Sequence, residues 1–351
     1  MTLYIGVDFH PHQQTVSYLE SERGEILQTS LGHNPELVRR FYEQFKGAVV
    51  GIEASGIASW FERLMNDLGH ELRVGNPHLI RARARSRHKS DRRDADLILD
   101  LLLKDEFPAL WRRSPESQSV LELLRFRRAL VTQRTQVCNR LQALAHAAGL
   151  PKRKLQSKRA RRALLEAALS ETQSFQRAQL FGLLDELTAR IERVEELLDQ
   201  QAETDERVRL VRTHTGVGLL SGLALVHTLG DVRRFASSKQ AVAFVGLDPL
   251  ERSSAGKTRT GSISKAGSPL LRELLGHAMH SAVRFDAELK AFYKRLAKRR
   301  TKSIAKVAAT RKLLIRLFIM LRDEIDYQEF KRRGLGSRNT CGVSRSEMTV
   351  F

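Results

Sequence analysis

The sequence predicts an α/β domain followed by a longer, mainly helical region. Up to about residue 76, short β-rich runs and one continuous apolar run alternate with helix signals, an order typical of a sheet covered by helices. From Asp91 to about Asp205 no strand signal occurs, and apolar residues recur at helical spacing. The 351 residues exceed the usual size of one domain, and 42% hydrophobic residues are enough to fill more than one core.

The N-terminal elements follow one another at short intervals. Residues 3–9, 14–20 and 25–30 read as three strands because turn-forming His-Pro-His and Arg-Gly segments separate them. A helix is expected over residues 35–45, a strand buried on both faces over 48–54, a helix that ends at Gly69, and a strand over 71–76. This order fits a ribonuclease-H-like domain, to which we assign residues 1–110.

Residues 111–208 are predicted to form a helical coiled-coil region. Their seam residues alternate at spacings of four and three: Leu180, Leu184, Leu187, Ile191, Val194 and Leu198. The charge-dense segment 151–162 breaks the helical pattern and would turn the chain back as an antiparallel hairpin. The seam fits packing within the chain and dimerisation equally well.

The composition changes again near residue 211, and residues 209–328 are expected to form a mostly helical C-terminal domain. Thr215, Gly216 and Gly218 resemble the hairpin of a helix-hairpin-helix element, in which glycines let backbone N–H groups approach a phosphate. Alternatively, the glycines permit tight helix packing. A glycine- and serine-rich basic loop follows at 251–268, helices resume from 270 to about 326, and 329–351 is a polar tail expected to be mobile.

The charge balance predicts a polyanionic partner. The chain carries 60 Lys and Arg against 40 Asp and Glu, for a formal net charge of +20. Its two cysteines, Cys138 and Cys341, lack any pairing or CxxC pattern, which argues against a disulfide framework and structural zinc. Because no secretion signal or membrane-spanning apolar stretch is evident, we expect a cytoplasmic protein without a membrane partner.

Four carboxylates in the N-terminal third point to metal chemistry. Asp8 and Glu53 each follow an apolar strand, so their side chains emerge at strand ends that can face one another. Asp91 and Asp94 lie three residues apart in a predicted helix, where they would repel each other unless a cation lies between them. A hard, oxygen-preferring cation, most plausibly Mg²⁺, fits such a group.

Taken singly, these residues also have ordinary interpretations. Asp91 can cap the helix and Asp94 can pair with a neighbouring cation, while Asp96 and Asp100 are expected to face solvent or form salt bridges. A dense run of cations precedes and surrounds the two aspartates and would draw phosphate towards them. We expect nucleic-acid contacts from Arg81, Arg83, Arg85, Arg87, Lys89, Arg92 and Arg93.

The C-terminal basic loop holds further candidates. Ser253 and Ser254 are followed by Lys257, Arg259 and Lys265, so an exposed hydroxyl there would be surrounded by phosphate-binding cations. Spacing alone does not make either serine a nucleophile, because turn chemistry by itself selects serine in such loops.

The succession of these motifs resembles one family. GVDF with Asp8, GIEASG with Glu53, HKSDRRDAD with Asp91 and Asp94, and GLDPLERSSAGKTRTGSISKAGS are similar, in order and interval, to the DEDD transposases of the insertion-sequence one-hundred-and-ten family, which are related to Piv-type invertases. The likeness runs from about residue 3 to about residue 325.

This resemblance implies a RuvC-like N-terminal domain whose four acidic residues bind Mg²⁺ and a C-terminal transposase domain with a serine nucleophile. Matching the loop places that serine at Ser254, although Ala255 stands where glycine often follows, which keeps Ser253 as an alternative. Thr215 likewise stands where a proline is common. The resemblance also implies element-end and target DNA, a guide RNA encoded beside the gene, and a homo-oligomer, a dimer or tetramer, with a composite active site.

Two other functions fit parts of the pattern. A metal-only nuclease of the Holliday-junction resolvase type would need the acidic quartet but neither serine. A nucleic-acid-binding scaffold would need only the charge and the coiled coil. Neither accounts for both the quartet and the serine loop.

Overall fold

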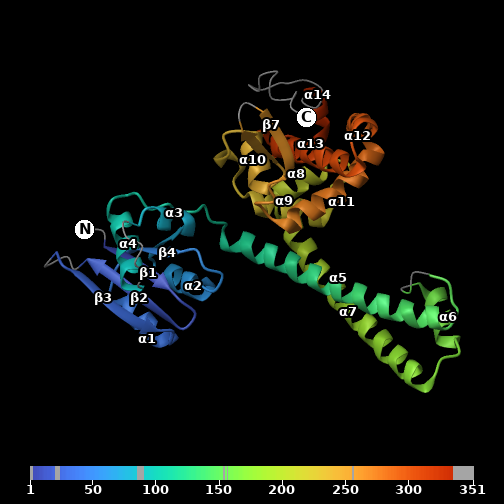
Figure 1. Cartoon of the computed structure of the whole chain (residues 1–351), viewed down its shortest axis with the longest axis horizontal. Helices are drawn as coiled ribbons and strands as arrows, with labels where there is room; N and C mark the ends of the chain where they lie inside the picture. Colours follow the sequence, from blue (N-terminus) through green and yellow to red (C-terminus); the bar gives the residue numbers. More distant parts are fainter. Residues whose placement is uncertain are drawn as a thin grey trace. The chain divides into compact units, whose positions relative to one another are not determined.

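The computed structural model describes residues 3–19, 24–84, 91–152, 155, 157–254 and 257–334, and leaves the side chains of residue 91 and residues 251–260 undescribed. The chain divides into two compact units, Met1–Arg112 and Arg113–Phe351. The predicted succession of an α/β part and a mainly helical part is confirmed (Figure 1). None of the described helices combines the length and the apolar character that crossing a lipid bilayer requires.

The first unit is built on a five-stranded mixed sheet of order β3-β2-β1-β4-β5. β1 pairs antiparallel with β2 and parallel with β4; β2 pairs antiparallel with β3, and β4 parallel with β5. The elements are β1 (Tyr4–Phe9), β2 (Gln13–Leu19), β3 (Ile26–Gly32), α1 (Pro35–Glu43), β4 (Val49–Glu53), α2 (Ser59–Asp67), β5 (Glu71–Gly75), α3 (Pro77–Ala82) and α4 (Asp91–Leu103). The predicted strands are therefore present, and α3 is an additional helix, capped by Asn76.

Side-chain alternation along the strands gives the sheet two buried faces. On one face, Ile5 packs with Tyr42 of α1 and Phe61 of α2. On the other, Val49 packs with Ile98 and other apolar residues of α4. This second face is the one that carries the candidate site.

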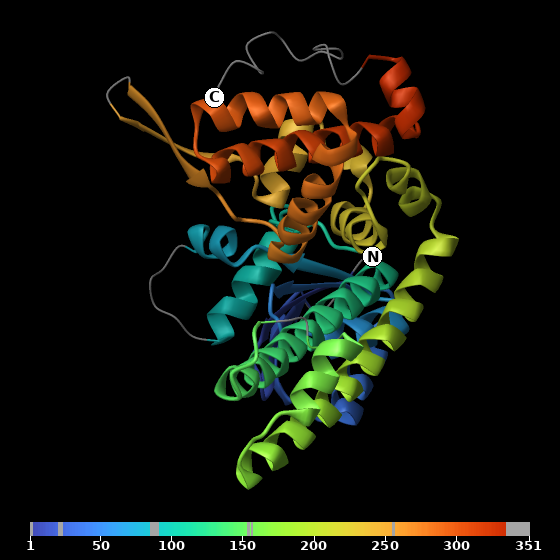
Figure 2. The same ribbon diagram turned by 90° about the vertical axis from the view of Figure 1, so that its right-hand side faces the viewer.

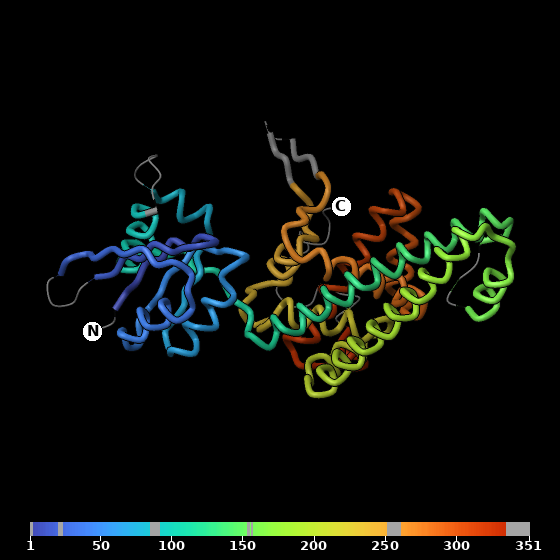
Figure 3. The backbone as a smooth tube through the Cα atoms, turned by 90° about the horizontal axis from the view of Figure 1, so that it is seen from below, coloured from blue at the N-terminus to red at the C-terminus, as the bar shows by residue number. Residues whose placement is uncertain are grey.

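The second unit begins with a long helical hairpin and continues into a bundle of shorter helices. Its elements are α5 (Pro115–Ala147), α6 (Lys158–Glu166), α7 (Glu171–Thr204), α8 (Glu206–Arg212), α9 (Leu219–Leu229), the 3₁₀ turn η1 (Val232–Arg234), α10 (Ser238–Val245), β6 (Pro249–Ser254), β7 (Lys257–Ile263), α11 (Pro269–Phe285), α12 (Ala287–Arg299), α13 (Lys302–Asp323) and α14 (Tyr327–Arg332). In Figure 3, α5 and α7 run side by side along most of their length.

The predicted coiled-coil seam packs against another helix of the same chain. Leu184, Leu187 and Ile191 of α7 are buried in one core with Val137 and Leu141 of α5. The antiparallel hairpin is thereby confirmed, and intramolecular packing is the alternative that the structure supports. In this single chain, α5 therefore covers the side chains of the seam.

Two predictions for the C-terminal part are wrong. The segment expected to be a loop from 251 to 268 forms the antiparallel ribbon of β6 and β7, which extends from the helices in Figure 2. Threonines and Ile263 favour this extended pairing despite the polar composition. The tail also does not begin at 329, because α14 reaches Arg332 and buries Phe330 to 1% exposure in the core.

Candidate active site

Two of the predicted carboxylates occupy matching positions on neighbouring parallel strands. The register of β1 with β4 pairs Val7 with Ile52, and Asp8 and Glu53 are the next residues of each strand. Asp8 is only 7% exposed, and Glu53 is partly buried. Since corresponding residues of adjacent parallel strands point to the same face, both carboxylates belong to the face that α4 covers.

Glycines in the same two strands let α4 approach closely. A Cβ atom on Gly6 would lie 2.4 Å from the carbonyl oxygen of Ala95, and one on Gly51 would lie 2.7 Å from a methyl carbon of Leu102. Any side chain at Gly6 would thus collide with the backbone of α4. The close approach sets α4 directly on the strands that carry Asp8 and Glu53 at their C-terminal ends, with partly buried Asp94 one residue before Ala95.

A hydrogen-bonded aspartate fixes α4 across the sheet. Ser17 Oγ of β2 donates to Asp96 Oδ1 at 2.7 Å, and Gln28 Nε2 of β3 donates to the same oxygen at 2.5 Å. The prediction that Asp96 faces solvent or forms a salt bridge is therefore wrong, because the strand register brings Ser17 and Gln28 beneath it. Asp100 does form the expected salt bridge, with Lys104 Nζ at 2.6 Å.

The strand-end carboxylates have cationic or ionisable partners. His10 Nε2 lies 3.0 Å from Asp8 Oδ2, and Arg81 Nη2 donates to Glu53 Oε1 at 3.1 Å. Within the described ranges, which omit the Asp91 side chain, no three His, Cys, Asp or Glu side chains come together as a metal-binding group. The donors are nonetheless hard carboxylate oxygens at adjacent strand ends, which is the ligand chemistry that Mg²⁺ prefers.

The predicted basic stretch is only partly covered by the structure. Arg81 reaches Glu53, and Arg83 donates to the carbonyl oxygen of Glu106. Arg92 and Arg93 are exposed in the first turn of α4. Three further cations of the stretch lie outside the described residues: Arg85, Arg87 and Lys89.

In the second unit, both candidate serines lie at the end of β6. The backbone register pairs Ser254 with Lys257, Ser253 with Thr258 and Arg252 with Arg259. The side chains of these residues are not described. The serine segment is thus held by strand pairing, with two residues between the strands, and is not an extended loop.

The base of the ribbon is tightly built. A Cβ on Gly246 would lie 2.6 Å from the amide nitrogen of Ala266, and one on Gly267 would lie 2.2 Å from the carbonyl oxygen of Phe244 in α10. Ser264 Oγ donates to Asp248 Oδ1 at 2.5 Å across the start of the ribbon. Exposed Lys265 has a positive φ of 56° in this connection. The ribbon therefore starts from a fixed backbone.

The two glycines of the predicted hairpin have different environments. Gly216 has a φ of +90°, and a Cβ there would lie 2.3 Å from the amide nitrogen of Ala282 in α11. This contact supports the helix-packing interpretation of Gly216. Gly218 begins α9, and its added Cβ would have no heavy atom within 4 Å.

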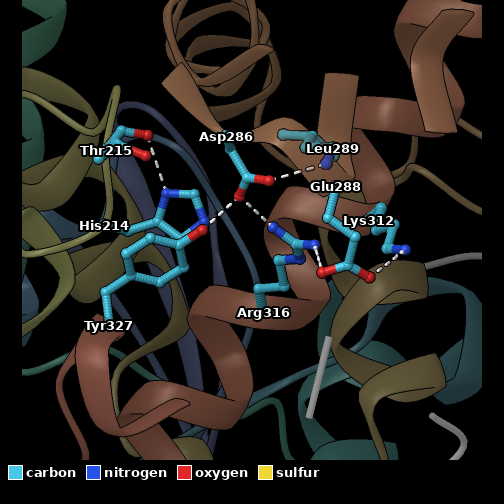
Figure 4. A network of polar contacts seen from close by, with 8 residues as sticks. All are labelled: His214, Thr215, Asp286, Glu288, Leu289, Lys312, Arg316 and Tyr327. Atoms are coloured by element: carbon cyan, nitrogen blue, oxygen red, sulfur yellow. Dashed lines mark hydrogen bonds and ion pairs between the residues drawn. The ribbon is translucent and has the colours of Figure 1, made fainter. Parts of the chain in front are cut away.

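A buried charge network that the sequence analysis missed joins α12, α13 and α14 (Figure 4). Asp286 caps α12 by accepting from the Leu289 amide at 2.8 Å, and it also accepts from Arg316 Nη1 at 2.5 Å and from the Tyr327 hydroxyl. Arg316 Nη2 donates to Glu288 Oε2 at 2.6 Å. Burial opposes ionisation of Asp286, but its hydrogen bonds and the Arg316 charge lower its pKa overall.

His214 completes the network at the beginning of the hairpin turn. Its ring packs on Tyr327 with centroids 4.1 Å apart, and its Nδ1 donates to the Thr215 carbonyl oxygen at 2.9 Å. Burial lowers the pKa of His214 to about 4, so the ring is neutral at physiological pH. The available sequence signal was Arg316, a charged residue in the otherwise apolar LLIRLF segment of α13.

A second buried cluster joins Ser117, His227 and Asp205. Ser117 Oγ lies 3.1 Å from His227 Nδ1, and His227 Nε2 lies 3.9 Å from Asp205 Oδ2. Ser117 and His227 are 7% and 6% exposed. This burial suits a role in packing α5 against α9 rather than attack on a large substrate.

Strand-end carboxylates on a mixed sheet, in a chain of this positive charge, are typical of the class of nucleic-acid-processing proteins. Comparison with known proteins identifies which family of nucleic-acid-processing proteins the chain matches. The profile described as "Transposase IS116/IS110/IS902 family" matches residues 208–294, and a DEDD transposase profile of the IS110 type, described as "Transposase", matches residues 5–148.

Relatives cover most of the chain. It is 30% identical over 334 residues to a Pseudomonas aeruginosa protein named "Probable family 20 transposase", covering 92% of this chain and 94% of that one. It is 30% identical over 273 residues to the "Transposase for insertion sequence element IS1111A" of Coxiella burnetii, covering 75% and 73%. Identity to the "Pilin gene-inverting protein" of Moraxella bovis is 28% over 281 residues, covering 77% and 79%. The chain belongs to the IS110 family of insertion-sequence transposases.

Proposed function

We propose that this transposase cuts and rejoins DNA with an Mg²⁺-binding acidic quartet and a serine nucleophile. The observation that carries the proposal is the placement of Asp8 and Glu53 at adjacent ends of parallel strands, under a helix that begins with Asp91 and Asp94. We further propose that this first unit is RuvC-like, as the sheet order and its covering helix support.

Asp8, Glu53, Asp91 and Asp94 would hold the metal. Bound Mg²⁺ would supply positive charge against the charge that grows on the reacting phosphate. In this structure His10 contacts Asp8 and Arg81 contacts Glu53. Once Mg²⁺ binds these carboxylates, the two side chains would be free to contact phosphate oxygens. Arg92 and Arg93, exposed beside the site, would add to the attraction for the DNA backbone.

Ser254 would perform the covalent step. Its hydroxyl oxygen would lose its proton as it attacks a DNA phosphorus, and the displaced sugar oxygen would take up a proton and leave as a DNA hydroxyl, so that one proton is transferred overall. The phosphoserine ester conserves the bond energy, and attack by the hydroxyl of another strand restores a phosphodiester and frees the serine. The position of Ser254 at the end of β6, paired with Lys257 in the backbone register, supports this role. Ser253 is the alternative.

We also propose that a guide RNA encoded by the element selects the DNA and that the active form is a homo-oligomer. The net charge of +20 supports binding of several nucleic-acid strands. Since the coiled-coil seam is buried within the chain, an oligomer would use other surfaces.

An adduct assay tests the proposal. Purified protein is incubated with Mg²⁺, labelled DNA that spans the element ends, and flanking RNA, and SDS-resistant protein–DNA adducts are measured. We expect an adduct that is lost in Ser254→Ala and Asp8→Asn, with Ser253→Ala as the matched variant. Strand joining that survives both serine substitutions would refute the serine mechanism, and cleavage to free ends without an adduct would indicate a metal-only nuclease.

A further inference from the structure

The solvent face of α12 carries a concentration of positive charge that the proposed catalytic chemistry does not use. Between Glu288 and Asp323 the chain has 12 Lys and Arg and no Asp or Glu. Six exposed members of this set lie on α12 and at its C-terminal end: Lys290, Lys294, Arg295, Lys298, Arg299 and Arg300. We call these six residues the α12 surface.

Three of the six cations lie opposite the apolar side of α12. Leu289 is fully buried, and Phe292 and Leu296 are partly buried at helical spacing from it. Lys290, Lys294 and Lys298 recur every four residues and so form one row on the exposed side. The amphipathic pattern therefore directs these three lysines away from the apolar side of the helix.

No ion pair neutralises these cations among the described residues, whereas some cations of other helices are paired. Arg39 pairs with Glu43, and Arg190 pairs with Glu186 at 2.5 Å. Among the described residues, none of the six cations of the α12 surface takes part in an ion pair, and Glu288 is engaged by Lys312 and Arg316. The like charges of this surface repel one another, and binding of a polyanion would relieve that repulsion.

The pattern fits a duplex backbone better than a single strand. Proteins bind single strands by stacking bases on exposed aromatic rings. On α12, however, neither Phe292 nor Tyr293 is exposed, and the Phe292 ring is covered by Arg295 and Lys312 at 5.7 Å and 4.9 Å from its centroid. The surface thus offers charge without a stacking platform.

The length of the surface matches several phosphates. From Lys290 to Arg300 the helical rise is about 15 Å. Duplex DNA carries one charge per about 1.7 Å of axis, or about nine phosphates over that length. The row of Lys290, Lys294 and Lys298 can therefore lie along several phosphates of one duplex segment.

We propose that the α12 surface binds the phosphate backbone of duplex DNA that flanks the reacting phosphates, without reading base sequence. The choice of DNA rests on the proposed function, in which element ends and target are the substrates. The contact itself requires neither the acidic quartet nor Ser254. It would hold flanking duplex by charge while other parts of the complex select the sequence.

A salt titration tests this proposal on the full chain. Binding of a fluorescein-labelled duplex of mixed sequence is followed by anisotropy at several KCl concentrations, without Mg²⁺. For Lys294→Gln/Lys298→Gln, the slope of log K against log salt should fall by about 2, because each lost phosphate contact removes about 0.9. Residual binding through other cations is expected.

The matched control is Arg190→Gln/Arg193→Gln, which removes the same charge from exposed positions of α7. This control should keep the wild-type slope, and circular dichroism should show both variants folded. An unchanged slope in the α12 variant, or an equal change in the control, would overturn the proposal. So would a double-stranded RNA that competes for the α12 surface better than DNA does.

The salt titration and the adduct assay together separate this proposal from the proposed function. The Ser254→Ala variant should bind duplex DNA like the wild type, since the α12 surface does not depend on the serine. If adducts fail to form while the salt slope depends on Lys294 and Lys298, only the serine mechanism fails. If adducts form and replacing the two lysines leaves the slope of log K against log salt unchanged, only the α12 proposal fails.

Discussion

Replacing Gly6 by alanine should impair catalysis by moving a helix, with no change to any carboxylate. The added Cβ would lie 2.4 Å from the Ala95 carbonyl oxygen and 2.5 Å from the Leu99 amide nitrogen. Ordinary van der Waals contact begins near 3.4 Å, so the backbone of α4 must move by about 1 Å relative to β1. Since the colliding atoms belong to backbone, no side-chain rotation relieves the contact.

This displacement has two measurable consequences. Overpacking costs about 1–3 kcal/mol of the free energy of unfolding, which a guanidinium titration detects. Asp94 lies one residue before Ala95 and would move with α4, away from its placement relative to Asp8 on β1. A misplacement of about 1 Å can reduce a rate by about 100-fold, so strand joining should fall by that order in Gly6→Ala.

The control is Gly32→Ala on β3 of the same sheet, where an added Cβ has no heavy atom within 4 Å. This variant should keep both stability and strand joining. Wild-type joining by Gly6→Ala would show that the position of α4 does not govern the chemistry. Equal loss in Gly32→Ala would show that any alanine in the sheet is harmful, and the steric reasoning would fail.

Three further predictions concern the second unit. Arg316→Met should cost about 3–5 kcal/mol in urea unfolding because it leaves Asp286 buried without its cation, and adding Asp286→Asn should recover part of that loss; no recovery would contradict the charge argument. Burial lowers the pKa of His214 from 6.5 to about 4, so the unfolded state takes up the proton at a higher pH than the folded state does. The free energy of unfolding should therefore fall by about 3 kcal/mol as the pH drops from 6.5 to 4. A His214→Asn variant whose stability has the same pH dependence would refute this prediction. Ile191→Ala should cost about 2–5 kcal/mol without changing the sedimentation coefficient; a change in oligomeric state would contradict a seam buried within the chain.

The strands of the first unit could be predicted because their signals are local. Apolar residues in β1 and β4 alternate or run continuously, and turn residues separate the strands. The same signals place Asp8 and Glu53 at strand ends. The role of Asp96 could not be predicted in this way, because it depends on the register that brings Ser17 and Gln28 together below α4.

The missed features share a physical cause. The ribbon of β6 and β7 has few apolar residues, so its sequence carries the composition of a loop although its backbone pairs as strands. Asp286 and Arg316 are 30 residues apart and meet only when α12 and α13 pack. A charged residue at an apolar helix position indicates a buried partner but does not name it.

Substitutions of the glycines that position the two proposed reactive groups test something different from substitutions of the groups themselves. Gly6 fixes α4 against β1, and Gly246 fixes the start of the ribbon that carries Ser254. Substitutions such as Asp8→Asn and Ser254→Ala remove a functional group while leaving these backbones in place. An alanine at either glycine keeps every functional group and moves the backbone. If chemistry depends on placement as the close contacts imply, both kinds of variant lose strand joining, but only the glycine variants also lose stability.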